Sequence, residues 1–377
     1  MCERQMTDRD NCIICNCKDI KEVYRFKEFP IYMGVSTGTY NEDIRQDMSF
    51  GECDQCGCIQ LKKLIPLDIL YAKGHNPAIG STWDRHHREF YEFVRKYATG
   101  KIVEIGGGNL KLALHLQQEK AIDSIVVYDN NSYHGETPSK ISFKQGFFDS
   151  IGNYEKVDCI IHSHLIEHLY DPMRDIATMT QMLSIDGYMF IAAPLIDNML
   201  KDKFTNAMNF EHTYMLTYSM LQHVLANAGL EIIDKRDFSK HVSFVVAKKV
   251  KTPIEAIGDY KKCGKIFKEF VSHYLSEIEQ IKKKLIQDKS RTFIFGAHIF
   301  TQYLFSFGLE EENFKNILDN DPAKQNNRLY GSRLMVKSPK ILKDIENPIV
   351  VLKAAQYTNE IKKDILENIN PNTRFIL

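Results

Sequence analysis

Short apolar runs alternate with helix-patterned stretches from residue 101 onward. The apolar runs cover residues 102–103, 125–128, 157–161 and 187–194, helical patterns cover 110–118 and 173–183, and an amphipathic stretch at 83–97 precedes them. Alternation of this kind is typical of a doubly wound sheet of parallel strands covered by helices. The pattern therefore predicts an α/β domain with a Rossmann-like central sheet.

The same pattern recurs on a smaller scale toward the C-terminus. An apolar run at 292–295 leads into Gly296 and a helical stretch, and a second run ends at Asp319. This predicts a smaller Rossmann-like unit that lacks the third glycine of a dinucleotide site. Residues 257–286 read as a charged connecting helix, whose basic run Lys282–Lys284 is either a solvated face or a phosphate contact. We therefore expect an N-terminal domain over 1–80, a central domain over 81–252, a linker helix over 253–289 and a C-terminal α/β domain over 290–377.

Composition narrows the possible partners. The chain has 377 residues, more than one hydrophobic core usually holds. Lysine plus arginine equals aspartate plus glutamate at 49 each, so no net field attracts nucleic acid or an anionic membrane. The sequence has no apolar run of about 18 residues and no signal-peptide core near its start. We expect a cytoplasmic protein with a small-molecule substrate; the sequence does not predict its oligomeric state.

A glycine turn directly follows the first apolar run of the central domain. Glu104, Gly106 and Gly108 form a Glu-x-Gly-x-Gly pattern between an expected strand and an expected helix. Glycines let the backbone turn tightly and approach a ligand, and the N-terminus of a helix offers free N–H groups. The acidic residue and the missing third glycine favour S-adenosylmethionine (SAM) over a dinucleotide, because SAM carries an ammonium and a cationic sulfur. Glu104, Gly106 and Gly108 are therefore predicted cofactor contacts.

Further cofactor contacts are predicted where the next strands end. Asp129 closes the run 125–128 and can accept hydrogen bonds from ribose hydroxyls, unless it is only a turn or capping residue. Asp149 is placed to accept from the adenine amino group. His164 follows the run 157–161, at the edge of the sheet where ligands bind. Glu167 and His168 follow closely, but we expect them to begin a helix near the cofactor rather than to bind a metal.

Six of the nine cysteines lie in two clusters of identical spacing, Cys-x2-Cys-x-Cys, at residues 12–17 and 53–58. In a reducing compartment such pairs are better explained as metal ligands than as disulfides. Two Cys-x2-Cys turns supply a closed tetrahedral site, so we predict that Cys12, Cys15, Cys53 and Cys56 bind a structural Zn²⁺. A redox pair, or an iron–sulfur cluster that uses Cys17 or Cys58, remains an alternative.

A histidine beside a carboxylate, Glu211-His212, follows the fifth apolar run. Imidazole is the usual general base near neutral pH, and a nearby carboxylate can orient it. Adjacency alone is weak evidence for a dyad, because neighbouring side chains diverge on both strands and helices. Taken without context, the pair is better explained as the start of a helix than as a dyad.

In their order along the chain, these motifs resemble the family of three-domain sugar C-methyltransferases that act on nucleotide-linked keto-deoxysugars. The resemblance covers the paired Cys-x2-Cys module, the Glu-Ile-Gly turn, Leu-Ile-Glu-His-Leu-x-Asp-Pro at 165–172, Glu211-His212, and segments 293–297, 317–325, 331–334 and 348–352. It implies SAM, structural zinc, and a nucleotide-sugar held between the central and C-terminal domains. It also implies that His212, with Glu211 beside it, removes a proton next to a ketone.

Two segments depart from the pattern of that family. Where the family has Tyr-His-Glu-His, this chain has Asn-Phe-Glu-His at 209–212. The family's tyrosine-bearing segment after the zinc module is replaced by His-Asn-Pro at 75–77. These residues lie in an expected loop over 73–81, which either contacts the substrate or only connects two domains. Loss of these tyrosines leaves open an O-methyltransferase that acts on a sugar hydroxyl or another small alcohol. A second alternative is a non-catalytic, zinc-containing scaffold with a degenerate fold, against which the intact Gly106, Gly108 and Asp129 argue.

Overall fold

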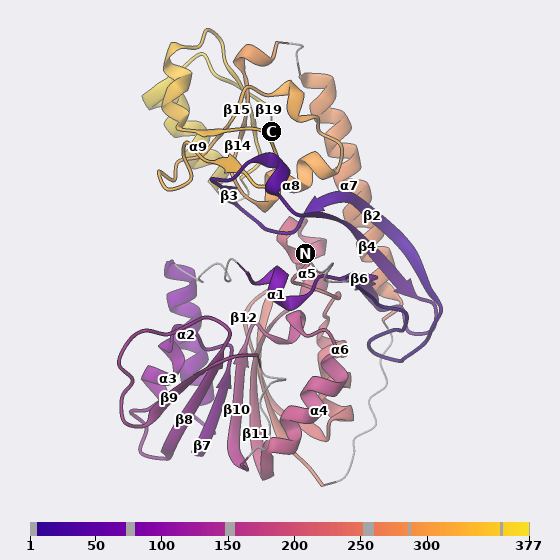
Figure 1. The fold of residues 1–377 in the computed structure, drawn as a ribbon, viewed down its shortest axis with the longest axis vertical. Coiled ribbons are helices and arrows are strands. Elements are labelled where there is room, and N and C mark those ends of the chain that lie inside the picture. The colour runs from indigo at the N-terminus through magenta and orange to yellow at the C-terminus, as the bar shows by residue number, and fades with distance from the viewer. Residues whose placement is uncertain are drawn as a thin grey trace. The chain divides into compact units, whose positions relative to one another are not determined.

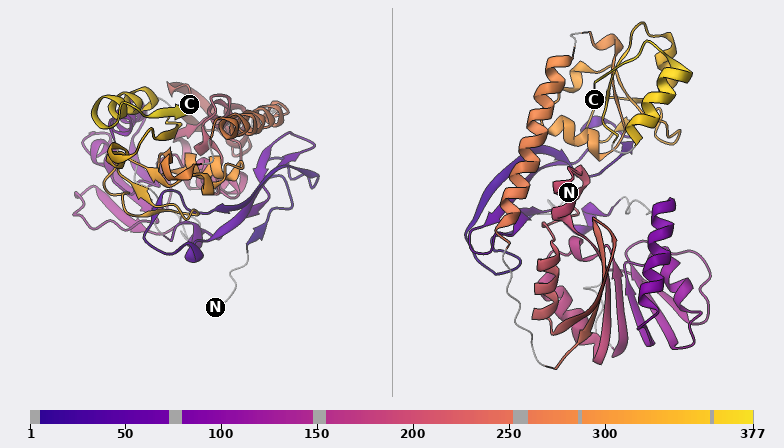
Figure 2. Two further views of the ribbon diagram at one scale, coloured as in Figure 1. Left: turned by 90° about the horizontal axis from the view of Figure 1, so that it is seen from above. Right: turned by 180° about the vertical axis from the view of Figure 1, so that it is seen from behind.

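The computed structural model describes residues 6–72, 80–147, 155–251, 260–285, 288–354 and 357–376. Its contacts divide the chain into two compact units, drawn in Figures 1 and 2. The first unit comprises Met1–Glu22, Gly51–Asp202 and Ala207–Ile266, and the second comprises Val23–Phe50, Lys203–Asn206 and Phe267–Leu377. The long strands β2 (Ile20–Pro30) and β4 (Arg45–Cys53) and the helix α7 (Lys262–Lys284) each contain residues of both units.

The first unit is built on a seven-stranded sheet with the order β12-β13-β11-β10-β7-β8-β9. The strands are β7 (Gly100–Ile105), β8 (Ile122–Asp129), β9 (Ile141–Gln145), β10 (Val157–Ser163), β11 (Leu183–Pro194), β12 (Leu230–Ser239) and β13 (Val242–Lys249). Neighbours from β9 to β11 are parallel, whereas β13 is antiparallel to both β11 and β12. The predicted α/β fold with a Rossmann-like central sheet is therefore confirmed.

Helices cover both faces of this sheet (Figure 1). One face carries α2 (Ser81–Val94) and α3 (Lys111–Leu116), and the other carries α4 (Pro172–Met182) and α6 (Tyr218–Asn227). Phe90 and Phe93 of α2 are buried in one core with Phe190 and Phe244 of the sheet. α4 begins where the sequence predicts, because Asp171 caps it by accepting from the Arg174 N–H and proline occupies its first turn.

The order of the strands reverses direction at β7, which has β8 on one side and β10 on the other. A crevice therefore forms beyond the carboxyl ends of these strands, where open α/β sheets bind ligands. The glycine turn follows β7 at this edge, Asp129 ends β8 and His164 follows β10. The fold thus brings three separate predicted segments to one place.

The N-terminal part of this unit consists of short strands and turns. β1 (Thr7–Asp8) pairs with β6 (Lys63–Leu64), and β5 (Ile59–Leu61) and α1 (Leu67–Leu70) complete it. Both cysteine clusters lie in turns next to these strands. A further short helix, α5 (Ile196–Lys201), follows β11.

The second unit contains a five-stranded parallel sheet with the order β17-β15-β14-β18-β19. Its strands are β14 (Thr292–Phe295), β15 (Asn316–Leu318), β17 (Val336–Lys337), β18 (Ile349–Leu352) and β19 (Arg374–Ile376), with helices α8 (Ile299–Ser306) and α9 (Thr358–Asp364). This is the smaller Rossmann-like unit that the sequence predicts.

Residues 23–50 belong to this second unit by their contacts. β3 (Val35–Ser36) pairs with β16 (Arg328–Leu329), and the Arg328 guanidinium donates two hydrogen bonds to the buried Asp43 carboxylate, at 2.6 and 2.8 Å. A bidentate, buried pair of this kind fixes both partners in place. The segment between the two cysteine clusters is therefore part of the C-terminal α/β unit.

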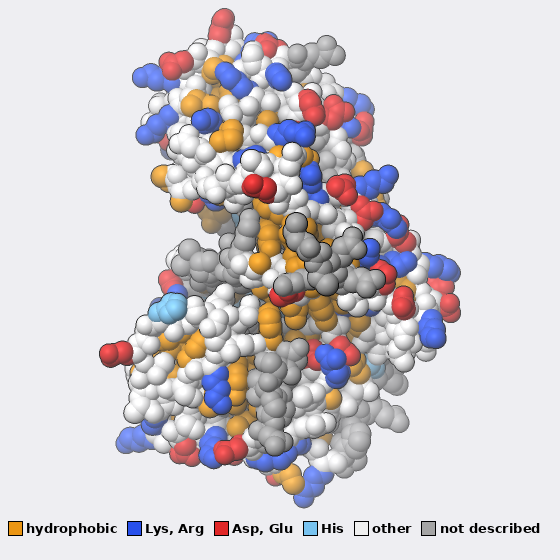
Figure 3. All heavy atoms as spheres, viewed as in Figure 1, with side chains coloured by type: hydrophobic (Ala, Val, Ile, Leu, Met, Phe, Trp, Pro, Cys, Tyr) orange, Lys and Arg blue, Asp and Glu red, His pale blue; other side chains and the backbone are white. Residues whose placement is uncertain are grey.

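No helix in the described part of the chain is long and apolar enough to cross a membrane. On the face drawn in Figure 3, basic and acidic side chains are interspersed rather than gathered by sign. This distribution agrees with the balanced charge of the sequence.

Candidate functional site

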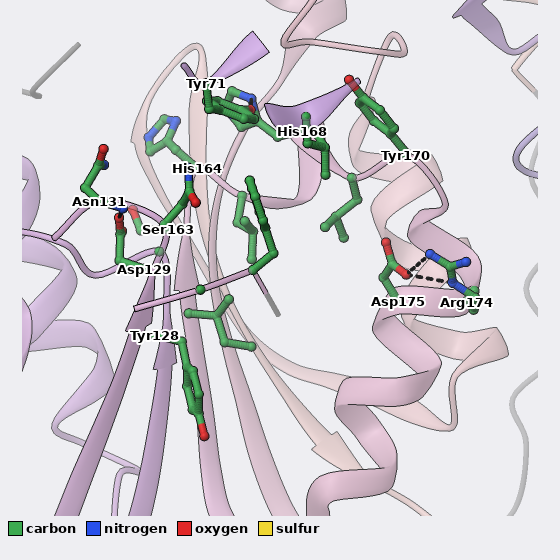
Figure 4. A pocket seen from close by; sticks show the side chains of 18 residues that line it. Tyr71, Tyr128, Asp129, Asn131, Ser163, His164, His168, Tyr170, Arg174 and Asp175 are labelled. Carbon is green, nitrogen blue, oxygen red and sulfur yellow. Dashed lines mark hydrogen bonds and ion pairs between the residues drawn. The ribbon is translucent and has the colours of Figure 1, made fainter. Parts of the chain in front are cut away.

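A cavity of about 330 Å³ lies at the carboxyl ends of β7, β8 and β10 (Figure 4). Its lining includes Gly106, Asp129, His164 and His168, and Tyr71 closes one side. Ligand sites of small molecules begin at about this volume. The cavity therefore coincides with the edge of the sheet where the sequence places the cofactor.

The glycine turn and Asp129 hold one another at this cavity. Gly106 has φ +83°, which favours glycine, and its N–H donates to the Tyr128 carbonyl at 2.8 Å. The Asp129 carboxylate accepts from the Gly108 N–H at 2.9 Å and from the Asn131 N–H at 2.8 Å. A Cβ at Gly108 would lie 2.8 Å from that carboxylate. Each carboxylate oxygen can accept a further hydrogen bond, such as one from a ribose hydroxyl of SAM.

Glu104 lies beneath the turn and does not line the cavity. Its side chain is buried, and a Cβ at Gly107 would lie 2.5 Å from the carboxyl carbon. Burial and the charge of Asp129 raise the pKa of Glu104 to about 8, while the backbone N–H of Ala113 opposes this shift. The residue therefore supports the turn from behind, mostly as a neutral acid near pH 7.

His164 lines the cavity directly after β10. Its backbone has φ +51°, unusual for a residue with a side chain, and its N–H donates to the Ala192 carbonyl at 2.8 Å. Strained backbone of this kind clusters at functional sites. The predicted adenine contact Asp149 and the loop at His75-Asn76-Pro77 lie outside the described residues.

A buried carboxylate, Glu167, lies among three histidines beside the cavity. The Glu167 side chain is 1% exposed, and its Oε1 lies 3.3 Å from Nδ1 of His164 and 3.8 Å from Nε2 of His168. Neither carboxylate oxygen has a well-directed hydrogen-bond donor among the described residues. Burial acts to raise the pKa of Glu167, but His164, His168 and His212 outweigh it and lower this pKa to about 2. Glu167 and His168 lie in a short 3-10 turn, Ile166–His168, and not in the regular helix we expected.

His212 and Glu211 reach this cluster from a distant segment. The His212 Nδ1 lies 2.9 Å from the Ala207 carbonyl, which makes Nδ1 the protonated nitrogen and leaves a lone pair on Nε2. The His212 ring lies 5.0 Å from that of His168 between centroids. Glu211 directs its carboxylate toward Nδ1 of His168, at 3.9 Å. The two predicted catalytic residues thus both contact His168, and they lie outside any regular helix.

Arg9 fixes the segment that carries these two residues. Its buried guanidinium donates to the carbonyls of Thr213, at 3.0 Å, and Tyr170, at 2.7 Å. The backbone of Leu61 in β5 also donates to the Thr213 carbonyl. Burial lowers the pKa of Arg9 to about 10, which leaves the side chain charged. A buried cation surrounded by carbonyl oxygens therefore ties the segment that carries Glu211 and His212 to the turn after β10.

The four cysteines predicted to bind metal converge on one point. The Sγ atoms of Cys12, Cys15, Cys53 and Cys56 all lie within 4.8 Å of one another, and two of the pairs are 3.5 Å apart. Ligands of a tetrahedral Zn²⁺ with Zn–S bonds of about 2.3 Å are about 3.8 Å apart, so the cluster is suited to such an ion. Cys17 and Cys58 fall outside this four-membered group. Gly57 has φ +80° after Cys56, and a Cβ there would lie 2.6 Å from the Lys261 backbone.

Comparison with known proteins identifies the central domain. Residues 83–235 match the model of a family described as a methyltransferase domain. Residues 83–235 therefore form a methyltransferase domain. No curated protein matches the chain.

Several solved structures share the fold of this domain. A SAM-dependent methyltransferase from Mesorhizobium loti is 12% identical, with a TM-score of 0.37 over 44% of this chain and 97% of its own. Human N-acetylserotonin methyltransferase in complex with SAM is 16% identical, with a TM-score of 0.38 over 44% of this chain and 52% of its own. At TM-scores this low, the likenesses carry no argument about substrate or mechanism.

Sequence reasoning missed several residues at the site of this methyltransferase. Tyr71, Asn131 and Tyr170 line the cavity, and Tyr71 contacts His168 through its hydroxyl, 3.3 Å from Nδ1. Arg9 lies far from the site in sequence and carries no motif. Asn131 could have been predicted from its position, because it follows the end of β8 by two residues. For Tyr71 and Arg9 the sequence holds no such signal.

Proposed function

We propose that this methyltransferase transfers the methyl group of SAM to a nucleotide-activated sugar or a related carbohydrate precursor, at a carbon next to a ketone, with His212 as the general base. The sugar class rests on the resemblance of the motifs along the whole chain. The role of the base rests on one observation: the Nδ1 of His212 lies 2.9 Å from the Ala207 carbonyl, which leaves Nε2 as the nitrogen that can accept a proton, and the ring lies beside His168, which lines the cavity.

Each part of the site has a separate role in the proposed reaction. Asp129 and the glycine turn hold the donor, which supplies an electrophilic methyl on its sulfonium. The Nε2 of His212 would take the proton from the acceptor carbon, and the electron pair left on that carbon would form the new bond to the methyl group. The bond from the methyl group to sulfur would break at the same time, its electron pair staying on the sulfur of the S-adenosylhomocysteine that leaves. His168 lines the cavity next to the His212 ring, and the Tyr71 hydroxyl and the Glu211 carboxylate approach its Nδ1. Placement of the acceptor in line with the sulfonium is the main source of rate.

Zinc is part of the proposal as a structural ion. Cys12, Cys15, Cys53 and Cys56 would bind it through four thiolates, which leaves no open position for a substrate. Its contribution would be to fold the two cysteine turns at residues 12–17 and 53–58.

Isotope exchange tests carbon methylation directly. The protein is saturated with S-adenosylhomocysteine, which cannot transfer a methyl group, and incubated in D₂O with nucleotide-linked keto-sugars. Deuterium should enter the carbon next to the ketone, and His212→Gln should abolish the exchange while S-adenosylhomocysteine still binds. Exchange at the wild-type rate in His212→Gln would remove this residue from the role of base.

The two alternative functions, an O-methyltransferase and a non-catalytic scaffold, predict different results with the same protein. An O-methyltransferase shows no exchange but labels a sugar hydroxyl when a nucleotide-sugar pool is incubated with isotopically labelled SAM. A non-catalytic scaffold fails at an earlier step, because calorimetry would detect no binding of S-adenosylhomocysteine in the micromolar range. Binding together with label in a carbon-linked methyl group is the outcome that the proposed reaction requires.

A further inference from the structure

The buried carboxylate of Glu167 requires a positive charge close to it. The carboxylate is 1% exposed and has no well-directed donor for either oxygen among the described residues. An ionised carboxylate in such surroundings costs several kcal/mol unless a positive charge lies close to it. The nearest basic atom is Nδ1 of His164, which lies 3.3 Å from Oε1 of Glu167 but is poorly directed for a hydrogen bond. The Nε2 of His168 lies 3.8 Å from the same oxygen, too far for a hydrogen bond.

Three ligand atoms nevertheless converge here. A carboxylate oxygen of Glu167 and one ring nitrogen each from His168 and His212 lie within 4.8 Å of one another. Two ligands bound at about 2.0–2.2 Å in tetrahedral geometry are separated by about 3.4 Å, and in octahedral geometry by about 3.0 Å. The gap between Glu167 and His168 thus exceeds a hydrogen bond and approaches the spacing of two ligands of one metal ion.

We propose that Glu167, His168 and His212 form a binding site for a divalent transition-metal ion beside the cofactor cavity. Two imidazoles and one carboxylate suit Zn²⁺, Co²⁺, Ni²⁺ or Fe²⁺ better than Mg²⁺ or Ca²⁺, which prefer oxygen ligands alone. Three protein ligands leave at least one position open, unlike the four-cysteine site.

The remaining contacts of the histidines already orient them for this role. The Nδ1–H of His212 donates to the Ala207 carbonyl, and Nδ1 of His168 lies 3.3 Å from the Tyr71 hydroxyl. Histidine ligands commonly have such a partner on the second ring nitrogen, and it fixes which nitrogen faces the metal. The Nε2 of His168 faces Glu167, and the Nε2 of His212 carries the free lone pair.

Occupation of this site has a consequence that rests on the proposed function. A metal ion on the Nε2 of His212 uses the lone pair that would take the proton from the acceptor. The two roles therefore exclude one another in a single molecule, and the ion acts as an inhibitor of base-dependent turnover.

Cobalt binding tests the site without any acceptor or methyl donor. The full-length protein, with its cysteine-bound metal in place, is dialysed against Co²⁺, and the bound metal is counted by mass spectrometry. We expect one equivalent beyond the cysteine site, with visible d–d bands but without the thiolate charge-transfer band that cobalt at cysteines produces. Glu167→Gln and His168→Asn should each weaken cobalt binding by at least about tenfold. Loss of a residue that only supports a metal ligand already weakens binding by about that factor, so loss of a ligand should cost at least as much.

The matched control is His241→Asn. His241 belongs to the same unit, but its Nε2 is already paired with Asp202 at 2.7 Å, so this substitution should leave the extra equivalent unchanged. Circular dichroism and thermal melting test whether each variant is folded. If a variant does not fold, the number of metal ions bound by the wild-type protein still tests the site. An extra equivalent that survives both Glu167→Gln and His168→Asn, or no extra equivalent in the wild type, overturns the site and leaves protonated imidazoles as the partners of Glu167.

Turnover separates the two proposals. Saturating Zn²⁺ should inhibit methyl transfer, and a chelator that spares the four-cysteine site should restore it. If the ion binds at Glu167 and raises turnover, the metal site stands and the assignment of His212 as the base fails. If no acceptor is methylated under any condition, the cobalt measurement still decides the metal site.

Discussion

The buried Glu104 makes the stability of the methyltransferase unit depend on pH in an unusual direction. Its carboxyl lies beneath the glycine turn, Oε2 has no partner among the described residues, and Asp129 is the neighbouring charge. Burial first, and Asp129 second, raise the pKa to about 8, whereas the ordinary value is 4.5. We perturb this group by replacing it with glutamine, which keeps the shape and removes the titration.

The sign and size follow from the difference between the two pKa values. Because the folded pKa lies above the unfolded one, the folded state keeps a proton that the unfolded state loses between these values. The stabilisation is fully present below the unfolded pKa, falls as pH rises, and is lost once pH passes the folded pKa. A separation of about 3.5 units at about 1.4 kcal/mol per unit gives a loss of about 5 kcal/mol in the free energy of unfolding.

Trp83 allows the measurement to be confined to the relevant unit. It is the single tryptophan of the chain and lies in α2, which packs on the same sheet as β7. Urea unfolding followed by its fluorescence, from about pH 5 to about pH 9, gives the free energy of unfolding at each pH. The wild type should lose several kcal/mol more than Glu104→Gln across this range. Parallel curves for the two proteins would refute the assignment of a raised pKa to Glu104.

Further predictions concern the base segment, the donor site and the cysteines. Arg9→Met removes the charge-assisted hydrogen bonds to the carbonyls of Thr213 and Tyr170 and should lower the free energy of unfolding by about 3 kcal/mol. Arg9→Lys should lower it by less. Equal losses for the two variants in urea titrations would contradict the role of the guanidinium. Asp129→Ala should weaken binding of S-adenosylhomocysteine by about 1–3 kcal/mol in calorimetry, and an unchanged dissociation constant would count against a cofactor role. Gly108→Ala should also weaken it, because the new Cβ meets Asp129 at 2.8 Å. Cys53→Ser should lose the bound metal and melt at a lower temperature; unchanged metal content would contradict the four-cysteine site.

Local patterns predicted the edge of the sheet well because each element there is short and continuous in sequence. The apolar runs correspond to β7, β8, β10 and β11, and the glycine turn and Asp129 follow strands at the positions that parallel topology requires. Side-chain direction was not predictable from the same pattern. Glu104 and Asp129 both lie near the ends of neighbouring strands, yet Glu104 points beneath the turn and Asp129 lines the cavity.

Contacts between distant segments lay beyond the sequence. Asp43 and Arg328 are 285 residues apart, and their buried pair joins residues 23–50 to the C-terminal α/β unit, which an N-terminal domain over 1–80 did not anticipate. His212 meets His168 across 44 residues through loops whose geometry no periodicity encodes. The carboxylate that lies in one cluster with His168 and His212 is that of Glu167, 45 residues away from His212 in sequence.

The cysteine site and the proposed base share one piece of backbone. β5 begins directly after Cys58, and its residues bond to the segment that follows His212: the Leu61 N–H donates to the Thr213 carbonyl, and the Met215 N–H donates to the Ile59 carbonyl. Arg9, next to β1, closes the same arrangement through Thr213. A metal ion that fixes the cysteine turns would therefore also limit where His212 can lie. This coupling gives a physical reason for a structural metal in a methyltransferase whose donor site, at the glycine turn and Asp129, contains none of its ligands.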